Sequence, residues 1–110
     1  MSIQKVKFSD DNFDAETSKG LYVVCFEEPT DHDCQRQAKI IEKATNEIKQ
    51  PVKVGTCDVE KCFALAQRFR VTSIPTTIVF KDGKEVDRLV GYRHEMTLIK
   101  HLKKDAGKDA

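Results

Sequence analysis

The sequence has no tryptophan, three prolines, five glycines and no long run of apolar residues. A membrane-spanning helix needs about 20 consecutive apolar residues, so the chain is not expected to cross a bilayer. Basic and acidic residues nearly balance, and the net charge of +1 gives no reason to predict a nucleic-acid partner. The first residues contain no long apolar region, so no secretory leader is predicted. Together these absences predict a cytoplasmic protein, in a compartment where thiols are mostly reduced.

The residues that are present indicate one folded unit. We predict a single domain over residues 1–110, a monomer, with a frayed tail at 105–110. Strands are predicted at residues 3–8, 21–26, 52–57, 76–80 and 85–90, and helices from residue 9 and at 31–49, 61–70 and 94–104. The alternation predicts an α/β fold with a partly parallel sheet. Asp82-Gly83 predicts a hairpin, which adds antiparallel strands.

Two of these segments carry the strongest patterns. Residues 21–26 form an uninterrupted apolar run, typical of a central strand that is covered on both faces. Residues 31–49 repeat apolar side chains at helical spacing, and Asp31 is a preferred N-cap residue. The apolar stripe of this helix consists of Ala38, Ile41, Ala44 and Ile48.

Two motifs follow these patterns. Residues 30–34 read Thr-Asp-His-Asp-Cys, and Ile74-Pro75-Thr76 opens a later strand. With the order of elements, these segments resemble the thioredoxin family over nearly the whole chain. The resemblance implies the thioredoxin fold, a central mixed β-sheet flanked by helices on both faces.

In that family the first motif reads Trp-Cys-Gly-Pro-Cys. The resemblance places Cys34 at the resolving cysteine and Asp31 at the attacking cysteine. Aspartate cannot form a mixed disulfide, so we predict little or no dithiol–disulfide oxidoreductase activity. Cys25 stands where many members carry a buried aspartate that manages the proton of the resolving cysteine. Asp31 and Asp33 are expected to keep the Cys34 pKa at or above its ordinary range, although a helix N-terminus alone would lower it.

The second motif implies a binding groove. By resemblance, Pro75 is the cis-proline that faces the active-site turn, and the backbone of Ile74 pairs with an extended peptide. Gly91 matches a glycine that lines the same groove, and Thr30 stands where a tryptophan flanks it. Tyr92 is either an exposed contact aromatic or a cover for the last helix. The implied partner is an extended protein or peptide segment.

The rim of this groove is rich in carboxylates. Glu27, Glu28, Asp31 and Asp33 favour a basic partner through charge complementarity. Residues 31–34 have metal-ligating types, but neighbours on a helical turn point in different directions. We therefore predict no metal and no cofactor.

Two functional hypotheses stay open at this point. In the first, the protein keeps the groove for binding and has lost dithiol chemistry. In the second, it is an atypical thiol redox protein, a protein-disulfide reductase or a factor in redox homeostasis, that uses Cys34 with Cys25 or with a partner thiol. A purely structural role is the third alternative. Cys57 and Cys62 lack the spacing of a metal or redox motif and are predicted to be ordinary core or surface cysteines.

Overall fold

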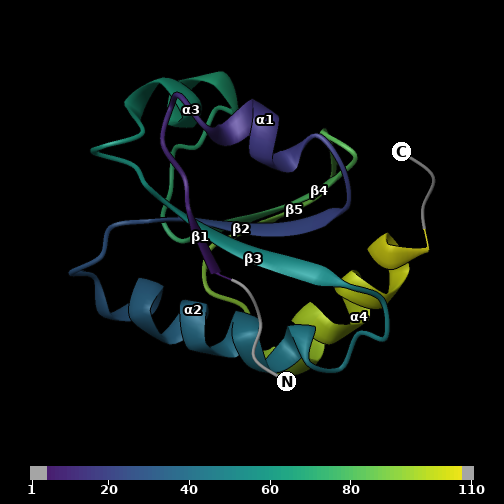
Figure 1. Cartoon of the computed structure of the whole chain (residues 1–110). Helices are drawn as coiled ribbons and strands as arrows, with labels where there is room; N and C mark the ends of the chain where they lie inside the picture. Colours follow the sequence, from purple (N-terminus) through teal and green to yellow (C-terminus); the bar gives the residue numbers. More distant parts are fainter. Residues whose placement is uncertain (1–4, 108–110) are drawn as a thin grey trace.

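A computed structural model describes residues 5–107 of the chain. Their elements alternate between strands and helices before ending in a hairpin and a helix (Figure 1). In chain order they are β1 (Lys5–Lys7), α1 (Phe13–Thr17), β2 (Leu21–Glu27), α2 (His32–Thr45), β3 (Val52–Asp58), α3 (Phe63–Arg68), β4 (Thr76–Lys81), β5 (Lys84–Val90) and α4 (Glu95–Ala106).

The strands form one mixed sheet in the order β1-β3-β2-β4-β5. β3 runs parallel to both β1 and β2, whereas β4 runs antiparallel to β2 and β5. β2 therefore lies at the centre, and its first six residues are buried, as predicted for a strand covered on both faces. The fold class predicted from the sequence is confirmed.

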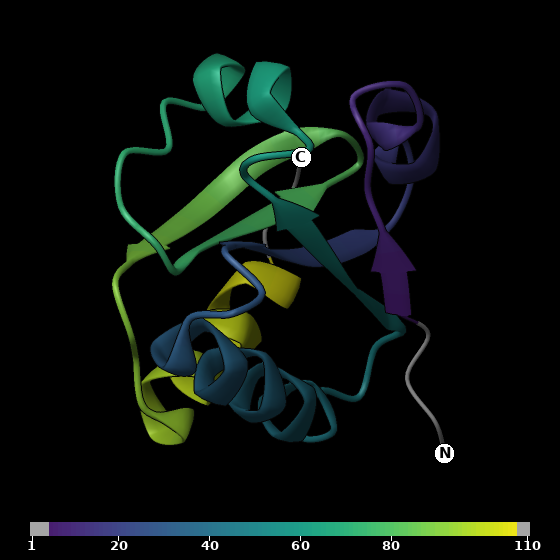
Figure 2. The same cartoon turned by 90° about the vertical axis from the view of Figure 1, so that its left-hand side faces the viewer.

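Each face of the sheet has its own core. α1 and α3 cover one face, and α2 and α4 lie side by side on the other (Figure 1, Figure 2). The α1/α3 face is rich in aromatic rings that meet edge to face, such as Phe13 with Phe80 at 5.1 Å between ring centroids. The α2/α4 face is built from aliphatic side chains, including Ile41, Leu98 and Leu102.

The helices differ from their predicted lengths at their ends. α2 ends at Thr45 instead of residue 49, where the Thr45 hydroxyl bonds the Glu42 carbonyl at 2.8 Å and tighter turn bonds follow. α4 continues past Lys104 to Ala106. The predicted frayed tail therefore starts too early, because Asp105 and Ala106 are buried and Lys81 donates to the Ala106 carbonyl at 2.9 Å.

The hairpin between β4 and β5 is confirmed. Asp82 and Gly83 both have a left-handed backbone, with φ of 50° and 84°, as the favoured two-residue turn requires. Residues 3 and 4 of the predicted first strand and residues 108–110 of the predicted tail lie outside the described residues. Within residues 5–107, no helix is both long and apolar enough to cross a membrane.

Candidate functional site

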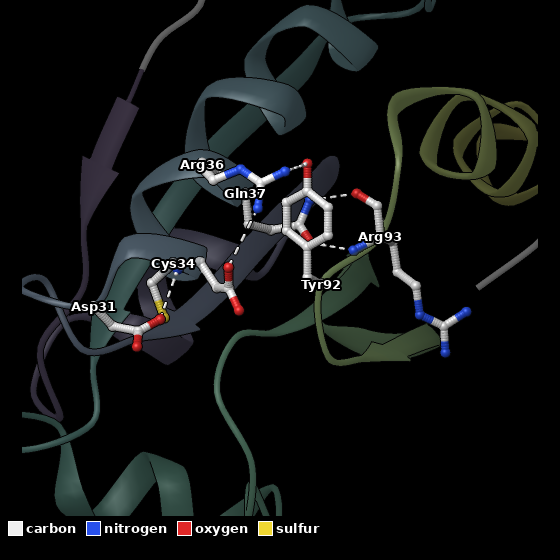
Figure 3. Close-up of polar contacts among 7 residues, drawn as sticks. Asp31, Cys34, Arg36, Gln37, Tyr92 and Arg93 are labelled. Carbon is white, nitrogen blue, oxygen red and sulfur yellow. Dashed lines mark hydrogen bonds and ion pairs between the residues drawn. The ribbon is translucent and has the colours of Figure 1, made fainter.

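The turn from β2 into α2 is organised by Asp31. Its backbone is extended (ψ 130°), and its carboxylate accepts a hydrogen bond from the Cys34 amide at 2.9 Å (Figure 3). Its own amide donates to the Glu28 carbonyl at 2.9 Å. Asp31 is thus the N-cap of α2, as predicted, and it satisfies one of the amides that a helix start leaves without a partner.

The contact between Asp31 and Cys34 changes the pKa values of the two side chains in opposite directions. The amide of Cys34 holds the pKa of Asp31 below its ordinary value. Burial, followed by the nearby carboxylates of Asp31 and Glu27, raises the pKa of Cys34 to about 11, although a hydrogen bond with the Glu28 backbone acts in the opposite direction. Cys34 is only 1% exposed. At neutral pH the site therefore contains a carboxylate and a neutral thiol, as expected from the sequence.

Cys25 lies in the middle of β2, opposite Thr56 on β3 and Thr77 on β4. Burial is the main cause that raises its pKa, and the charges of Glu27 and Cys34 add to it, while the Thr77 hydroxyl lowers it. Both cysteines are free. Cys34 therefore contributes to the raised pKa of Cys25, and the two thiols are not bridged.

The second predicted motif lies at the same end of the sheet. Phe26, near the end of β2, pairs with Thr76, at the start of β4, so the segments that leave β2 and enter β4 meet there. The Ile74-Pro75 peptide is cis, and the Pro75 carbonyl accepts a hydrogen bond from the Gly91 amide at 2.8 Å. Pro75 and Gly91 are therefore joined, as the resemblance implied.

The backbone around Pro75 has unpaired groups at Ile74 and open space at Gly91. Ile74 is half-buried, and within residues 5–107 neither its amide nor its carbonyl makes a hydrogen bond. Gly91 has φ 82°, and a Cβ placed there would meet nothing within 4 Å. Open space next to unpaired backbone groups is the arrangement that strand addition uses.

Tyr92 is held by α2. The Arg36 guanidinium lies 4.3 Å from the centre of its ring and donates to its hydroxyl at 3.1 Å (Figure 3). The ring also contacts His94, at 5.6 Å between centroids, just before α4. Tyr92 is therefore half-buried and contacts α2 and the residue that precedes α4.

Gln37 joins α2 to the backbone of Arg93, the residue after Tyr92. It is fully buried in α2, and its side-chain amide donates to the Arg93 carbonyl at 3.0 Å and accepts from the Arg93 amide at 2.6 Å. No sequence motif singled out Gln37 or Arg36. A signal for Gln37 existed, because it lies three residues after Cys34 and four before Ile41, on the buried stripe of the helix.

The rim of the site carries mixed charge. Burial and then Asp58 raise the pKa of Glu27, and Asp33 pairs with Arg36 at 3.4 Å. The acidic character expected at positions 27, 28, 31 and 33 is therefore partly offset by Arg36. Thr30 is exposed at this turn. Among residues 5–107, no three His, Cys, Asp or Glu side chains are grouped so that they could hold a metal ion.

Comparison with known proteins identifies a single family. The family model described as thioredoxin matches residues 4–104. A thioredoxin from Staphylococcus saprophyticus is 33% identical over 99 residues, which cover 90% of this chain and 95% of that protein. A thioredoxin from Bacillus subtilis is 34% identical over 93 residues, covering 84% of this chain and 89% of that protein.

Proposed function

The chain belongs to the thioredoxin family, and from this premise we propose that it binds an extended protein segment beside Pro75 without performing dithiol–disulfide exchange. One observation carries the proposal. The Asp31 carboxylate accepts a hydrogen bond from the Cys34 amide at 2.9 Å. Asp31 stands at the position where the family resemblance places the attacking thiol.

The chemistry of exchange explains why this matters. A thiolate must attack the disulfide, and a second thiol must then release the mixed disulfide. Asp31 has no sulfur, which removes the first step. Cys34 cannot replace it efficiently, because with a pKa of about 11 roughly one molecule in ten thousand is a thiolate at pH 7.

The N-terminus of α2 does not bring the pKa of Cys34 down to its ordinary value. Unpaired amides at the start of a helix normally favour a nearby anion. Here the anion is the Asp31 carboxylate, which takes the Cys34 amide and adds its own negative charge next to the sulfur. The Cys34 amide, which could stabilise a thiolate at the start of the helix, is therefore bonded to the Asp31 carboxylate.

Binding needs different features, and these are retained. The free backbone of Ile74 offers one donor and one acceptor to an extended segment, and Gly91 presents no side chain to block it. Basic residues of such a segment are favoured close to Glu27, Glu28 and Asp31 through charge complementarity. They are disfavoured close to Arg36, which carries the opposite charge. We infer a monomer that works in the cytoplasm and takes a partly basic protein segment.

A thiol redox function is the second candidate. The observation that favours it is that the charge of a Cys34 thiolate would raise the pKa of Cys25. Both thiols are protonated and buried, however, so exchange between them or with a partner thiol would be slow.

The binding proposal is tested by titrating isotope-labelled protein with an extended basic peptide and following amide shifts. We expect shifts at residues 30–34, 73–76 and 90–92. Glu28→Lys should slow association at low salt, whereas Glu47→Lys, at an exposed position beyond the end of α2, should not. Shifts confined to other surfaces, or equal effects of the two variants, would contradict the proposal.

A further inference from the structure

Two arginines make one end of the candidate groove basic. Arg36 lies in the second turn of α2 with its side chain against Tyr92, and Arg93 is the residue that follows Tyr92 (Figure 3). Both arginines are exposed. They lie next to Gly91, where an added Cβ would meet nothing within 4 Å. Two positive charges therefore stand beside the open space that an extended segment would use.

The Arg36 guanidinium is held in position and keeps free donors. It lies 4.3 Å from the centre of the Tyr92 ring, and its terminal nitrogens donate to the Tyr92 hydroxyl at 3.1 Å and to the Asp33 carboxylate at 3.4 Å. A guanidinium has five N–H donors in one plane, and these two bonds use only part of them. The pair with Asp33 is long and exposed on both sides, so it neutralises Arg36 weakly.

Arg93 is fixed mainly through its backbone. The buried Gln37 side chain accepts from its amide at 2.6 Å and donates to its carbonyl at 3.0 Å. The Nε atom of Arg93 donates to the Val90 carbonyl at 3.2 Å. Among residues 5–107, no acceptor pairs with its two terminal nitrogens. The end of this side chain is therefore open to an acceptor from a partner.

The charge of the site changes sign along α2. Asp31 is ionised at neutral pH, because the Cys34 amide holds its pKa below the ordinary value. Arg36 lies five residues later, about 7.5 Å further along the helix axis. An extended segment advances about 3.3 Å per residue, so a short stretch of it can lie beside both charges.

We propose that the segment bound beside Pro75 also carries a carboxylate side chain, which the guanidinium groups of Arg36 and Arg93 bind next to Tyr92. This inference rests on the proposed binding function and adds an acidic residue to the basic one that the rim favours. Guanidinium groups bind carboxylates through charge-assisted hydrogen bonds, often two at once. The site therefore selects a partner by the order of its charges, because a segment with the opposite order would place like charges together at both ends.

A scan with short peptides on the folded full-length protein tests this. The starting peptide is extended, capped at both ends and carries one lysine. Glutamate, or glutamine as its neutral match, is then placed in turn at each position on either side of that lysine. Amide shifts give the affinity of each peptide. Close to the acidic rim, glutamate should bind more weakly than glutamine.

At the position that reaches Tyr92 the order should reverse. There glutamate should bind about twofold to fivefold more tightly than glutamine at low salt, as expected for an exposed ion pair. The gain should shrink as salt is added. Glutamate that binds no more tightly than glutamine at any position overturns the proposal.

Variants of the protein assign the gain. The double variant Arg36→Gln, Arg93→Gln should lose it, and the two single variants should show how it is divided. The matched control is Lys43→Gln, Lys103→Gln, which removes two charges from exposed positions in the last turns of α2 and α4. A gain that persists in the double arginine variant, or is lost equally in the control, overturns the proposal.

The same titrations separate this inference from the binding proposal. If the lysine peptide shifts residues 73–76 but glutamate adds nothing at any position, the groove binds and only the carboxylate inference fails. If no peptide of the scan shifts residues 73–76, both fail.

Discussion

Two groups of cysteines lie on opposite faces of one sheet and differ in what surrounds them. Cys34 lies at the first turn of α2, where its amide donates to the half-buried carboxylate cap Asp31. Cys57 and Cys62 lie in the aromatic core beneath α3. All three thiols are buried, and the pKa of each is raised.

The difference separates two requirements of disulfide chemistry, an acidic thiol and a second thiol beside it. Cys34 has the favourable backbone position, but the residue that caps its helix is an aspartate. Cys57 and Cys62 have an unfavourable environment for ionisation and lie in one core. A partner thiol permits a disulfide even where reaction is slow, whereas its absence prevents one however reactive the remaining cysteine is.

The largest effect should come from giving Cys34 a partner. In Asp31→Cys, disulfide reduction should rise over the parent by orders of magnitude, because an attacking thiol then stands at the start of α2. Activity should stay below that of a dithiol thioredoxin, since Cys25 provides no carboxylate to accept a proton. A turbidity assay of insulin reduction measures this. Asp33→Cys, two residues after the cap, is the matched control, and its disulfide reduction should rise much less.

Alkaline pH should reveal both groups of cysteines as a loss of stability. A thiol whose pKa is raised on folding stabilises the protein below its unfolded value, 9.0 here, and the stability is lost as pH rises toward its folded value, about 11 for Cys34. Each such thiol contributes a slope of at most about 1.4 kcal/mol per pH unit in that window. Urea unfolding between pH 8 and pH 11 checks this.

The matched comparison is between the two groups. Cys34→Ala should reduce the alkaline slope by one thiol, and Cys57→Ala should reduce it by another, whatever each does to stability at pH 7. An unchanged slope in Cys34→Ala would mean that this thiol is not protonated in the folded protein at pH 9.

A third change should affect only the Cys34 side. Gln37→Ala removes the two part-buried hydrogen bonds that join the buried Gln37 side chain to the Arg93 backbone, which should destabilise the protein by about 1–3 kcal/mol. Gln35→Ala, which loses one exposed bond to the Pro29 carbonyl, is the control and should change stability far less. Amide shifts in Gln37→Ala should be found near Tyr92 and be absent near Cys62; shifts of equal size at both would contradict the assignment.

The smallest effect concerns the charge next to Cys34. Asp31→Asn keeps a residue that caps helices well and removes one negative charge, so alkylation of Cys34 at neutral pH should become slightly faster. It should remain slow, because burial is the first cause of the raised pKa. A mass-resolved alkylation time course checks this. A rapid reaction in the parent near pH 6 would show that a thiolate is already formed.

Much of this site was predictable because it depends on local pattern. The buried strand, the Asp31 cap and the hairpin at Asp82-Gly83 each follow from a few neighbouring residues. The contacts that join α2 to the segment after β5 were not predictable, since Gln37 and Arg93 are 56 positions apart. A buried glutamine and an exposed arginine give no sign in the sequence of where their partners lie.

Cys57 and Cys62 are buried in one core and are free, in agreement with the prediction of ordinary core or surface cysteines from their spacing. The turn that places them there was not predictable, because it closes on the Asp58 carbonyl, which is a property of backbone geometry and not of residue type.

The most direct test of the central claim is insulin reduction by the parent protein compared with Cys34→Ser, with the rate of the chemical reductant alone subtracted. We expect the two proteins to be indistinguishable and both to stay at the background rate, because the parent has no attacking thiol at position 31. Robust turnover by the parent that is lost in Cys34→Ser would contradict it and would establish the redox function instead.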